Sequence, residues 1–202
     1  MNQLLIIGAS GHGKVVADIA SKNGYKKILF FDDNKYLKMC GDYPVVGDTD
    51  CVNDYEGDIF VAIGNNLIRR RIIKKIELQG RNIPVLIHPN SVIAKDVSVG
   101  AGTVVVAGAI INPGTHIGKG CIINTASSID HDCIIKSFTH ISVGAHVAGT
   151  VIIGSCSWIG VGAVISNNLE ICSDCMIGAG AVVINDINQK GTYVGVPAKR
   201  IK

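Results

Sequence analysis

The sequence has few of the features that mark membrane, secreted or nucleic-acid-binding proteins. No apolar stretch reaches the 18 residues of a transmembrane helix, and the first residues lack the basic start and long apolar run of a signal peptide. The net charge is only +3 over 202 residues, and no basic run is interleaved with aromatic residues, which make up 5%. We therefore expect a soluble, cytoplasmic protein that binds neither nucleic acid nor membrane.

The seven cysteines are odd in number, which fits a reducing compartment in which cysteine serves as a small apolar residue. Cys172 and Cys175 form a C-x-x-C pair, which could bind a metal or cycle between thiol and disulfide. No second pair of ligands lies at zinc spacing, so we interpret the two cysteines as structural residues that neither bind a metal nor form a redox pair. We expect no metal in this protein.

What the sequence has in abundance is a six-residue repeat over residues 91–186. Sixteen consecutive blocks carry Ile or Val at the third place, from Ile93 to Val183, without an insertion. A six-residue period fits neither a helix nor a long alternating strand, and is typical of a parallel β-helix with three short strands per coil. Eighteen residues then make one coil, and residues eighteen apart stack at about 4.8 Å.

The alternation of side chains along a strand assigns a direction to each place of a block. The first and third places should point into the prism, and the second and fourth should face outward. The first place is mostly small, as a tight corner requires; examples are Thr103, Ala109 and Cys121. Because the periodic residues only build the prism, chemistry is expected from the polar residues that break the pattern.

The first 88 residues predict a separate domain in which strands and helices alternate. The strands are expected at residues 3–7, 27–31, 58–63 and 83–87, and the helices at residues 14–22 and 67–79. This order predicts a small Rossmann-like parallel sheet with a ligand crevice at the carboxyl ends of its strands. We therefore expect an α/β domain over residues 1–88, followed by an all-β parallel β-helix with a C-terminal tail over residues 89–202.

The first predicted strand runs into a glycine-rich turn, GASGHG at residues 8–13. With Lys14 it satisfies G-x-x-x-x-G-K, but Val15 stands where a P-loop needs Ser or Thr to hold magnesium, so an NTPase is not expected. The order of the glycines also differs from the dinucleotide fingerprint, which argues against a redox cofactor. The turn either offers backbone N–H groups and a helix N-terminus to a pyrophosphate, or only lets strand and helix pack.

Three strand ends of this domain should converge at one edge of the sheet. The residues at these ends are Ser10, Gly11 and His12, then Asp32 and Asp33, and finally Gly64. The two aspartates are placed to accept hydrogen bonds from a ribose or a base; alternatively, they cap a turn. The sequence thus predicts a nucleotide-binding edge without specifying the nucleotide.

Within the repeat, the polar exceptions centre on Asp130-His131-Asp132, at a predicted corner of the prism. A histidine flanked by carboxylates can be oriented and made more basic, as a general base near neutral pH requires; the alternative is a solvated turn histidine. One coil further on lies Gly149, whose unobstructed backbone N–H could stabilise an oxyanion roughly 5 Å above the base. His140 and His146 hold outward second places and could line a groove or a subunit seam.

After the last block the chain becomes basic, with Lys190, Lys199, Arg200 and Lys202. Either this tail is a solvated end, or it meets the phosphates of a ligand that lies along the last coils.

These segments together resemble the left-handed β-helix acyltransferases. The resemblance rests on the unbroken hexapeptides, on the segment from Asn124 to Asp132 and on the closing GVPAK at residues 195–199. The GASGHG turn, FDD at 31–33 and IGNN at 63–66 narrow it to the bacterial nucleotide-sugar N-acetyltransferases, including those of bacillosamine biosynthesis, and the sialic acid O-acetyltransferases.

The resemblance implies a homotrimer with active sites between neighbouring β-helices and with acetyl-CoA, but no metal, as co-substrate. His131 would be the general base, and Asp132 would orient it and raise its basicity. The expected contacts to acetyl-CoA are His140, the N–H of Gly149, Val161 and Gly178. The expected contacts to the nucleotide sugar are Ser10, Gly11, His12, Asp32, Asp33 and Gly64.

The implied activity is acetylation of the 4-amino group of a UDP-linked 4-amino-4,6-dideoxy sugar, in the biosynthesis of bacterial surface glycans or glycoprotein sugars. Amino-sugar members more often carry glutamate where Asp132 stands, and Asp-His-Asp also occurs among O-acetylating members. O-acetylation of sialic acid or a related nonulosonate is therefore the alternative, although the glycine turn and both aspartates favour a nucleotide sugar. A non-catalytic β-helix protein that binds a nucleotide sugar is the third hypothesis, against which the outward Asp-His-Asp opposite a glycine argues.

Overall fold

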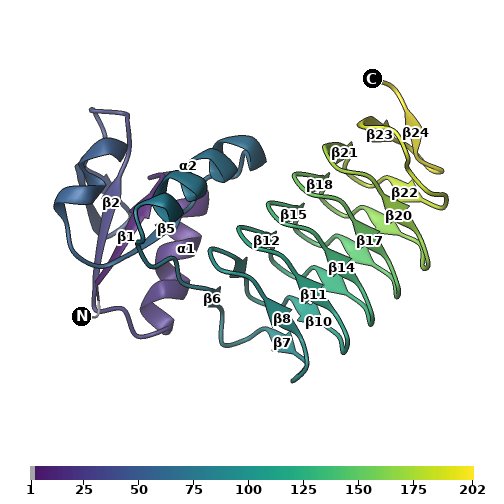
Figure 1. The fold of residues 1–202 in the computed structure, drawn as a ribbon, viewed down its shortest axis with the longest axis horizontal. Coiled ribbons are helices and arrows are strands. Elements are labelled where there is room, and N and C mark those ends of the chain that lie inside the picture. The colour runs from purple at the N-terminus through teal and green to yellow at the C-terminus, as the bar shows by residue number, and fades with distance from the viewer. Residues whose placement is uncertain (1–2) are drawn as a thin grey trace. The chain divides into compact units, whose positions relative to one another are not determined.

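The computed structural model describes residues 3–202 and divides the chain into two compact units. The N-terminal unit ends at Pro89, and the C-terminal unit is Asn90–Lys202. Figure 1 shows a sheet with helices in the first unit and a ladder of short strands in the second. No helix in residues 3–202 is long and apolar enough to cross a lipid bilayer.

The N-terminal unit is built on a five-stranded sheet with the order β3-β4-β2-β1-β5. Its strands are β1 (Gln3–Ile7), β2 (Lys27–Phe31), β3 (Met39–Cys40), β4 (Tyr43–Gly47) and β5 (Asp58–Val61). β1 pairs in parallel with β2 and β5, β2 pairs in parallel with β4, and β3 is antiparallel to β4. The predicted α/β class with a parallel sheet is confirmed.

Two α-helices and a short 3-10 helix complete this unit: α1 (Gly11–Lys22), η1 (Thr49–Asp54) and α2 (Asn66–Leu78). The inward face of α1 buries Val16 and Ile19, and that of α2 buries Ile73 and Ile76. Each such side chain contributes roughly 1.5–3 kcal/mol by leaving water. Because apolar packing between the helices and the sheet stabilises this unit, the polar loops at the strand ends are available to contact a ligand.

One predicted strand is wrong. Residues 83–87 contain only the two-residue strand β6 (Leu86–Ile87), which is not part of the five-stranded sheet. Pro84 lacks the N–H that a ladder position needs, so the chain there is irregular. The sheet is extended instead by β4 and β3, whose short and partly exposed segments carry no clear alternation in the sequence.

The C-terminal unit is a left-handed parallel β-helix, as the sequence predicts. One face holds β7 (Val92–Ile93), β10 (Ile110–Ile111), β13 (Ser128–Ile129), β16 (His146–Val147), β19 (Val164–Ile165) and β22 (Val182–Val183). A second face holds β8 (Ser98–Val99), β11 (His116–Ile117), β14 (Ile134–Ile135), β17 (Ile152–Ile153) and β20 (Glu170–Ile171). The third holds β9 (Val104–Val105), β12 (Ile122–Ile123), β15 (His140–Ile141), β18 (Trp158–Ile159) and β21 (Cys175–Ile177), and continues into β23 (Gly191–Val194) and β24 (Lys199–Arg200).

Strands pair with a register of eighteen residues, as Ile111 with Ile129 and Ile129 with Val147. The third place of every block from Val105 to Val183 is buried. Only Ile93 and Val99, the third-place residues of the first two blocks, are partly exposed, since no coil of the repeat precedes them. The prediction that third-place side chains point into the prism is therefore confirmed. This direction also determines which side chains lie on the outer surface.

The corners explain the glycines of the repeat. From Gly102 to Gly180, the residue at the sixth place of every block has a positive φ. Glycine adopts this left-handed backbone at no steric cost, and Asn or Asp tolerates it better than most residues. Asp132 holds a φ of 57° at its corner, and the β-branched Thr150 holds 59° one coil above. The corner backbone therefore sets where the Asp132 side chain points.

Two neighbouring residues of β14 test this architecture. Ile135 is 1% exposed and Ile134 is 40% exposed. We expect Ile135→Ala to lower the free energy of unfolding by about 2–5 kcal/mol, because it leaves a cavity in the prism. The matched variant Ile134→Ala should lower it by about 1 kcal/mol or less. Urea unfolding followed by the fluorescence of Trp158 measures both, and equal losses would contradict the assignment of inward and outward places.

Candidate active site

The His131–Asp132 pair lies at the corner between β13 and β14. Nδ1 of His131 is 2.8 Å from Oδ2 of Asp132, and both side chains are more than half exposed. The coil below holds this corner, because the Asp132 N–H donates to the Pro113 carbonyl at 3.0 Å. A carboxylate only accepts hydrogen bonds, so Nδ1 carries the proton and the neutral ring presents Nε2 as its basic nitrogen.

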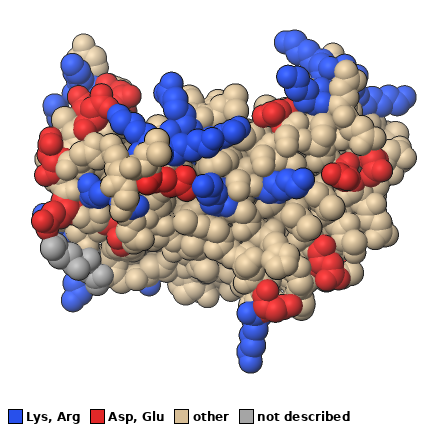
Figure 2. Space-filling view, in the orientation of Figure 1, with Lys and Arg blue, Asp and Glu red and all other residues tan. Residues whose placement is uncertain are grey.

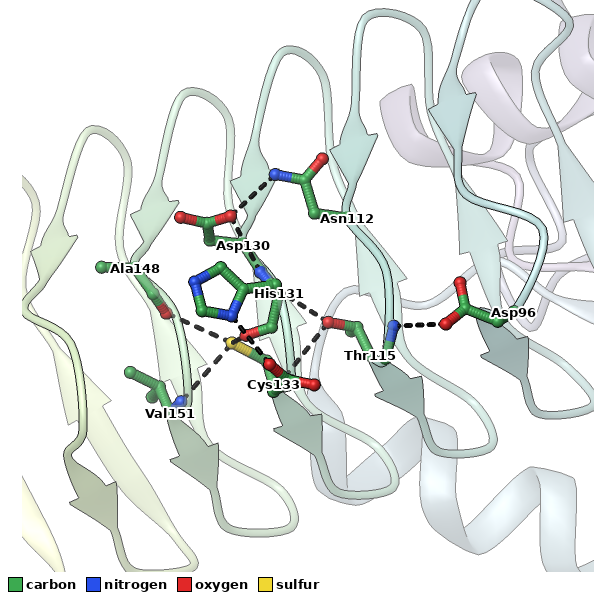
Figure 3. A network of polar contacts seen from close by, with 10 residues as sticks. Asp96, Asn112, Thr115, Asp130, His131, Cys133, Ala148 and Val151 are labelled. Atoms are coloured by element: carbon green, nitrogen blue, oxygen red, sulfur yellow. Dashed lines mark hydrogen bonds and ion pairs between the residues drawn. The ribbon is translucent and has the colours of Figure 1, made fainter.

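Asp130 lies on the other side of His131 and is held by two donors. Its Oδ1 accepts from the His131 backbone N–H at 2.8 Å and from Nδ2 of Asn112 at 2.8 Å (Figure 3). The Asn112 hydrogen bond, followed by that of the His131 backbone, holds the pKa of Asp130 below its ordinary value. Asp130 is therefore ionised at neutral pH beside the histidine.

The two carboxylates make His131 more basic. The hydrogen bond to Asp132 raises the pKa of His131 first, and the charge of Asp130 adds to it. A base whose pKa lies close to the working pH takes protons most effectively. The corner is thus chemically suited to accept a proton at Nε2.

Gly149 lies directly over this nitrogen. A Cβ added at Gly149 would be 2.6 Å from His131 Nε2, so any other residue would displace the ring. Among the described residues, the Gly149 N–H has no hydrogen-bond acceptor. The structure therefore brings the predicted pair together and leaves an N–H donor beside the basic nitrogen. An oxygen that becomes negative during a reaction would be stabilised by such a donor.

A shallow hollow of about 320 Å³ lies beside this corner on the face of β10, β13, β16 and β19. Asn112 and Asp130 line it, together with Ser128 and His146, which are joined by a 2.8 Å contact between Oγ and Nδ1. Ile110 and Val164 supply apolar walls. The hollow combines a carboxylate, three other hydrogen-bonding side chains and apolar surface, which suits a small polar acceptor.

The other residues predicted to contact a cofactor lie elsewhere on the β-helix. His140 in β15 is only 7% exposed; its ring packs on Trp158 at 4.6 Å, and its Nε2 lies 3.1 Å from Nδ2 of Asn124. Val161 is exposed. The Gly178 N–H donates to the Tyr193 carbonyl at 2.8 Å.

In the N-terminal unit, the carboxyl ends of β1, β2 and β5 meet because these strands are adjacent and parallel. Both oxygens of Asp32 are used by the chain itself: Oδ2 accepts from the Ala9 N–H at 2.7 Å, and Oδ1 from the Asn34 N–H at 2.9 Å. Asp33 accepts from the Thr49 N–H with Oδ1 at 3.0 Å. Asp32 therefore fastens the glycine turn to the end of β2, while Asp33 keeps a free oxygen among these contacts.

The glycine turn itself is open. Ser10 is the N-cap of α1 without a side-chain capping bond, and a Cβ at Gly11 or at Gly64 would meet nothing within 4 Å. Gly13, in contrast, is required for packing, because a Cβ there would collide with the Gly8 carbonyl. The first turn of α1 thus presents free backbone N–H groups, which suit an anion.

His12 and Arg69 lie behind this turn. Burial, and then the charge of Arg69, lowers the pKa of His12 to about 4, so the ring is neutral at physiological pH. Arg69 is 1% exposed and donates to the carbonyls of Ile63 and Gly64. Arg69 was not predicted as a site residue, yet its position four residues before Ile73 and seven before Ile76 places it on the inward face of α2.

A cavity of about 430 Å³ lies at the same edge of the sheet. Asp33 and Thr49 line it with the apolar side chains of Ile7 and Ile63 and with the cationic Arg71. A carboxylate, a hydroxyl and apolar walls in one cavity could accommodate a ribose and a base. Asp33 is therefore a predicted site residue that lines a cavity of this unit.

The C-x-x-C pair lies at a corner of the last coils. Sγ of Cys172 is 3.4 Å from Sγ of Cys175, and both are free thiols. Over residues 3–202, no group of three or more His, Cys, Asp or Glu side chains is arranged to hold a metal ion.

The N-terminal part of the chain matches a known domain family. Residues 3–76 match the family described as the PglD N-terminal domain. A curated UDP-N-acetylbacillosamine N-acetyltransferase of Bacillus subtilis is 31% identical over 113 residues, which are 53% of this chain and 52% of that protein. The alignment thus spans about half the length of this curated relative.

Solved structures resemble the chain over its whole length. The acetyltransferase domain of PglB from Neisseria gonorrhoeae in complex with acetyl coenzyme A is 41% identical, with a TM-score of 0.96 and 99% of each chain covered. A mutant of perosamine N-acetyltransferase from Caulobacter crescentus, in complex with CoA and GDP-perosamine, is 33% identical, with a TM-score of 0.94 and 99% and 97% of the two chains covered.

The geometry of the corner predicts how its histidine titrates. We expect the pKa of His131 to lie above the ordinary value of about 6.5, and Asp132→Asn to lower it, because the amide removes the charged acceptor at Nδ1. A pH titration of the imidazole carbon protons by NMR measures this, with His131→Gln for assignment. His116, on another face and bound to Ser98, serves as the internal control for effects away from this corner. A His131 pKa that Asp132→Asn leaves unchanged would contradict this account.

Proposed function

The chain belongs to the bacterial sugar acetyltransferases of the left-handed β-helix superfamily, and we propose that it transfers the acetyl group of acetyl-CoA to the 4-amino group of a UDP-linked 4-amino-4,6-dideoxy sugar. The observation that carries this proposal is the His131–Asp132 pair beneath the free N–H of Gly149. A base with an N–H donor nearby supplies the two groups that acyl transfer to an amine requires. The N-acetyltransferase names of the full-length relatives support the same reaction.

In this reaction the nitrogen of the sugar amine attacks the carbonyl carbon of the thioester. His131 takes the proton that the amine loses, and Asp132 stabilises the imidazolium that forms. The carbonyl oxygen becomes negative in the tetrahedral intermediate and is stabilised by the Gly149 N–H. The carbon–sulfur bond then breaks, and the leaving thiolate of CoA takes the proton from His131. Because the acetyl group passes directly between two bound substrates, correct placement supplies much of the rate.

We assign the nucleotide to the N-terminal unit. The open turn at Ser10 and Gly11 offers N–H groups to the pyrophosphate, and the cavity lined by Asp33 suits the ribose and base. Gly64 gives the ligand access at the end of β5, while His12 contributes a neutral ring behind the turn. Asp32 acts indirectly, since it holds the turn in place.

We assign acetyl-CoA to the coils that follow the His131 corner. Val161 is exposed on the next turns, and His140 and Gly178 mark the third face of the prism. Figure 2 shows cationic side chains gathered over the C-terminal end of the β-helix, where the tail carries Lys190, Lys199, Arg200 and Lys202. These charges suit the phosphates of the CoA nucleotide.

We propose a homotrimer with each active site between two β-helices, located in the cytoplasm. Large apolar side chains such as Val92, Ile110 and Val164 are exposed on the prism, which fits contact with further copies of the chain. The free cysteines fit a reducing compartment. Light scattering of the purified protein tests the assembly. The expected molar mass is that of three chains of 21.3 kDa each, and the mass of one chain would rule out the trimer.

O-acetylation of sialic acid or a related nonulosonate is the second candidate function. It is favoured by the Asp-His-Asp sequence at residues 130–132, but it leaves the cavity at Asp33 without a ligand. A protein that binds a nucleotide sugar without turnover would not need a free N–H at Gly149 above a basic nitrogen.

Release of CoA thiol from acetyl-CoA measures the proposed activity directly. The wild-type protein should turn over with a UDP-4-amino-4,6-dideoxy sugar, and His131→Ala should lose on the order of 100-fold or more in kcat, the usual share of a general base. His116→Ala is the matched control, because His116 is also an exposed histidine of the β-helix. It stands at the second place of its block and lies 2.7 Å from Ser98. The control variant should keep full activity.

Parallel assays with a GDP-linked 4-amino sugar and with free sialic acid separate the alternatives. Turnover on the GDP sugar alone would retain the reaction and change the nucleotide. Turnover on sialic acid alone would replace N-acetylation by O-acetylation. Saturable binding of the nucleotide sugar without thiol release from any acceptor would leave only the binding function.

A further inference from the structure

Asn112 lies one coil below Asp130 and contacts neither Nε2 of His131 nor Gly149. Its Nδ2 donates to Oδ1 of Asp130 at 2.8 Å, and the same oxygen accepts the His131 N–H at 2.8 Å. Figure 3 shows Asn112, Asp130 and His131 as neighbours, with Asp130 between the other two. We propose that Asn112 is a positioning residue that acts through Asp130 to fix the orientation and the basicity of His131.

The backbone and the Asn112 amide together fix the position of the Asp130 carboxylate. The strand ladder fixes both backbones, since the Asn112 N–H donates to the Ile129 carbonyl and the Asp130 N–H donates to the Val147 carbonyl. The Asp130 side chain would otherwise be free to rotate on the half-buried face. The amide of Asn112 holds Oδ1 where it also receives the His131 N–H, so one oxygen joins two coils at the corner. The ring of His131 begins at this fixed backbone position.

The same contact also acts electrostatically. Asn112 is the largest cause of the lowered pKa of Asp130, and Asp130 contributes to the raised pKa of His131. Asn112 therefore stabilises the negative charge of Asp130, and that charge in turn raises the pKa of His131. Without the amide donor, Asp130 would hold its proton to higher pH and its charge would move away from the ring. His131 would then lose part of its basicity, although its bond to Asp132 remained.

Within residues 3–202, Asp130 and Asp132 are the charged groups that raise the pKa of His131. On its own corner the ring faces Asp130 and Asp132, and beneath it lies the buried thiol of Cys133. From the coils below come Asn112 and the carboxylate of Asp96, which is bound to the Gly114 N–H at 2.8 Å. The coil above presents the uncharged segment 148–150, and His146 lies across the hollow, bound to Ser128.

The inference rests on the proposed function for its kinetic consequence but not for its titration. Asn112→Leu removes the amide donor at similar size. We expect its plateau kcat/KM to fall on the order of 10-fold, because the base is misplaced. We also expect the acidic limb of its pH profile to move to lower pH, in parallel with a lower His131 pKa by NMR. The limb follows the pKa of the base, which must be deprotonated to act.

Two further variants provide controls. Ser98→Ala changes an exposed polar residue on another face of the prism, where it contacts His116, and should leave both the rate and the limb unchanged. Asn112→Asp brings a second carboxylate to Asp130, so the pKa of His131 should not fall. Circular dichroism and the unfolding midpoint establish that each variant is folded.

The outcomes separate the hypotheses. A rate loss in Asn112→Leu with an unmoved limb and an unmoved His131 pKa would show a merely structural role and overturn the proposal, as would wild-type behaviour in all measurements. If the wild-type protein transferred no acetyl group, the proposed function would fail, while the NMR titration of Asn112→Leu would still decide whether Asn112 controls His131.

Discussion

Each coil of the β-helix rests on the previous one through parallel strand pairs eighteen residues apart. This register places Asn112 below Asp130 and Gly149 above His131 without a loop whose conformation must be selected. The backbone ladder is formed by short strands whose third-place side chains fill the prism. An exposed corner can therefore hold polar groups in fixed positions, because the buried residues of the same blocks supply the stability.

The two units position their polar groups by different physical means. At the His131 corner the groups are exposed, and short hydrogen bonds between neighbouring coils hold them. In the N-terminal unit a buried cation, Arg69, donates to the carbonyls at the end of β5, and burial followed by the charge of Arg69 lowers the pKa of His12 and keeps its ring neutral. Removing Arg69 would leave those carbonyls without a charged donor in the interior, where an unpaired polar group is costly. The first arrangement can exchange protons with a substrate, and the second preserves the shape of a turn.

The sequence was sufficient for the β-helix because a single place per block carries the hydrophobic signal, and the stacking of Gly149 on His131 follows from the same count. Arg69 was missed because three consecutive arginines at 69–71 conceal that only one lies on the inward face of α2. The contact of Asn112 with Asp130 depends on side-chain rotamers, which a repeat does not specify. β3 and β4 were missed because their residues alternate weakly, while the predicted strand at 83–87 was wrong because Pro84 interrupts it.

Because the rise per coil is constant, the number of coils sets the distance between the His131 corner and the C-terminal tail. Three coils separate the corner of His131 from the end of the repeat at Asp186, which corresponds to roughly 14 Å along the axis at about 4.8 Å per coil. An additional eighteen-residue coil between them would move the basic tail one increment further away and leave every contact around the histidine intact. The length of the groove and the chemistry at its start are thus independent properties of this chain, each open to change without the other.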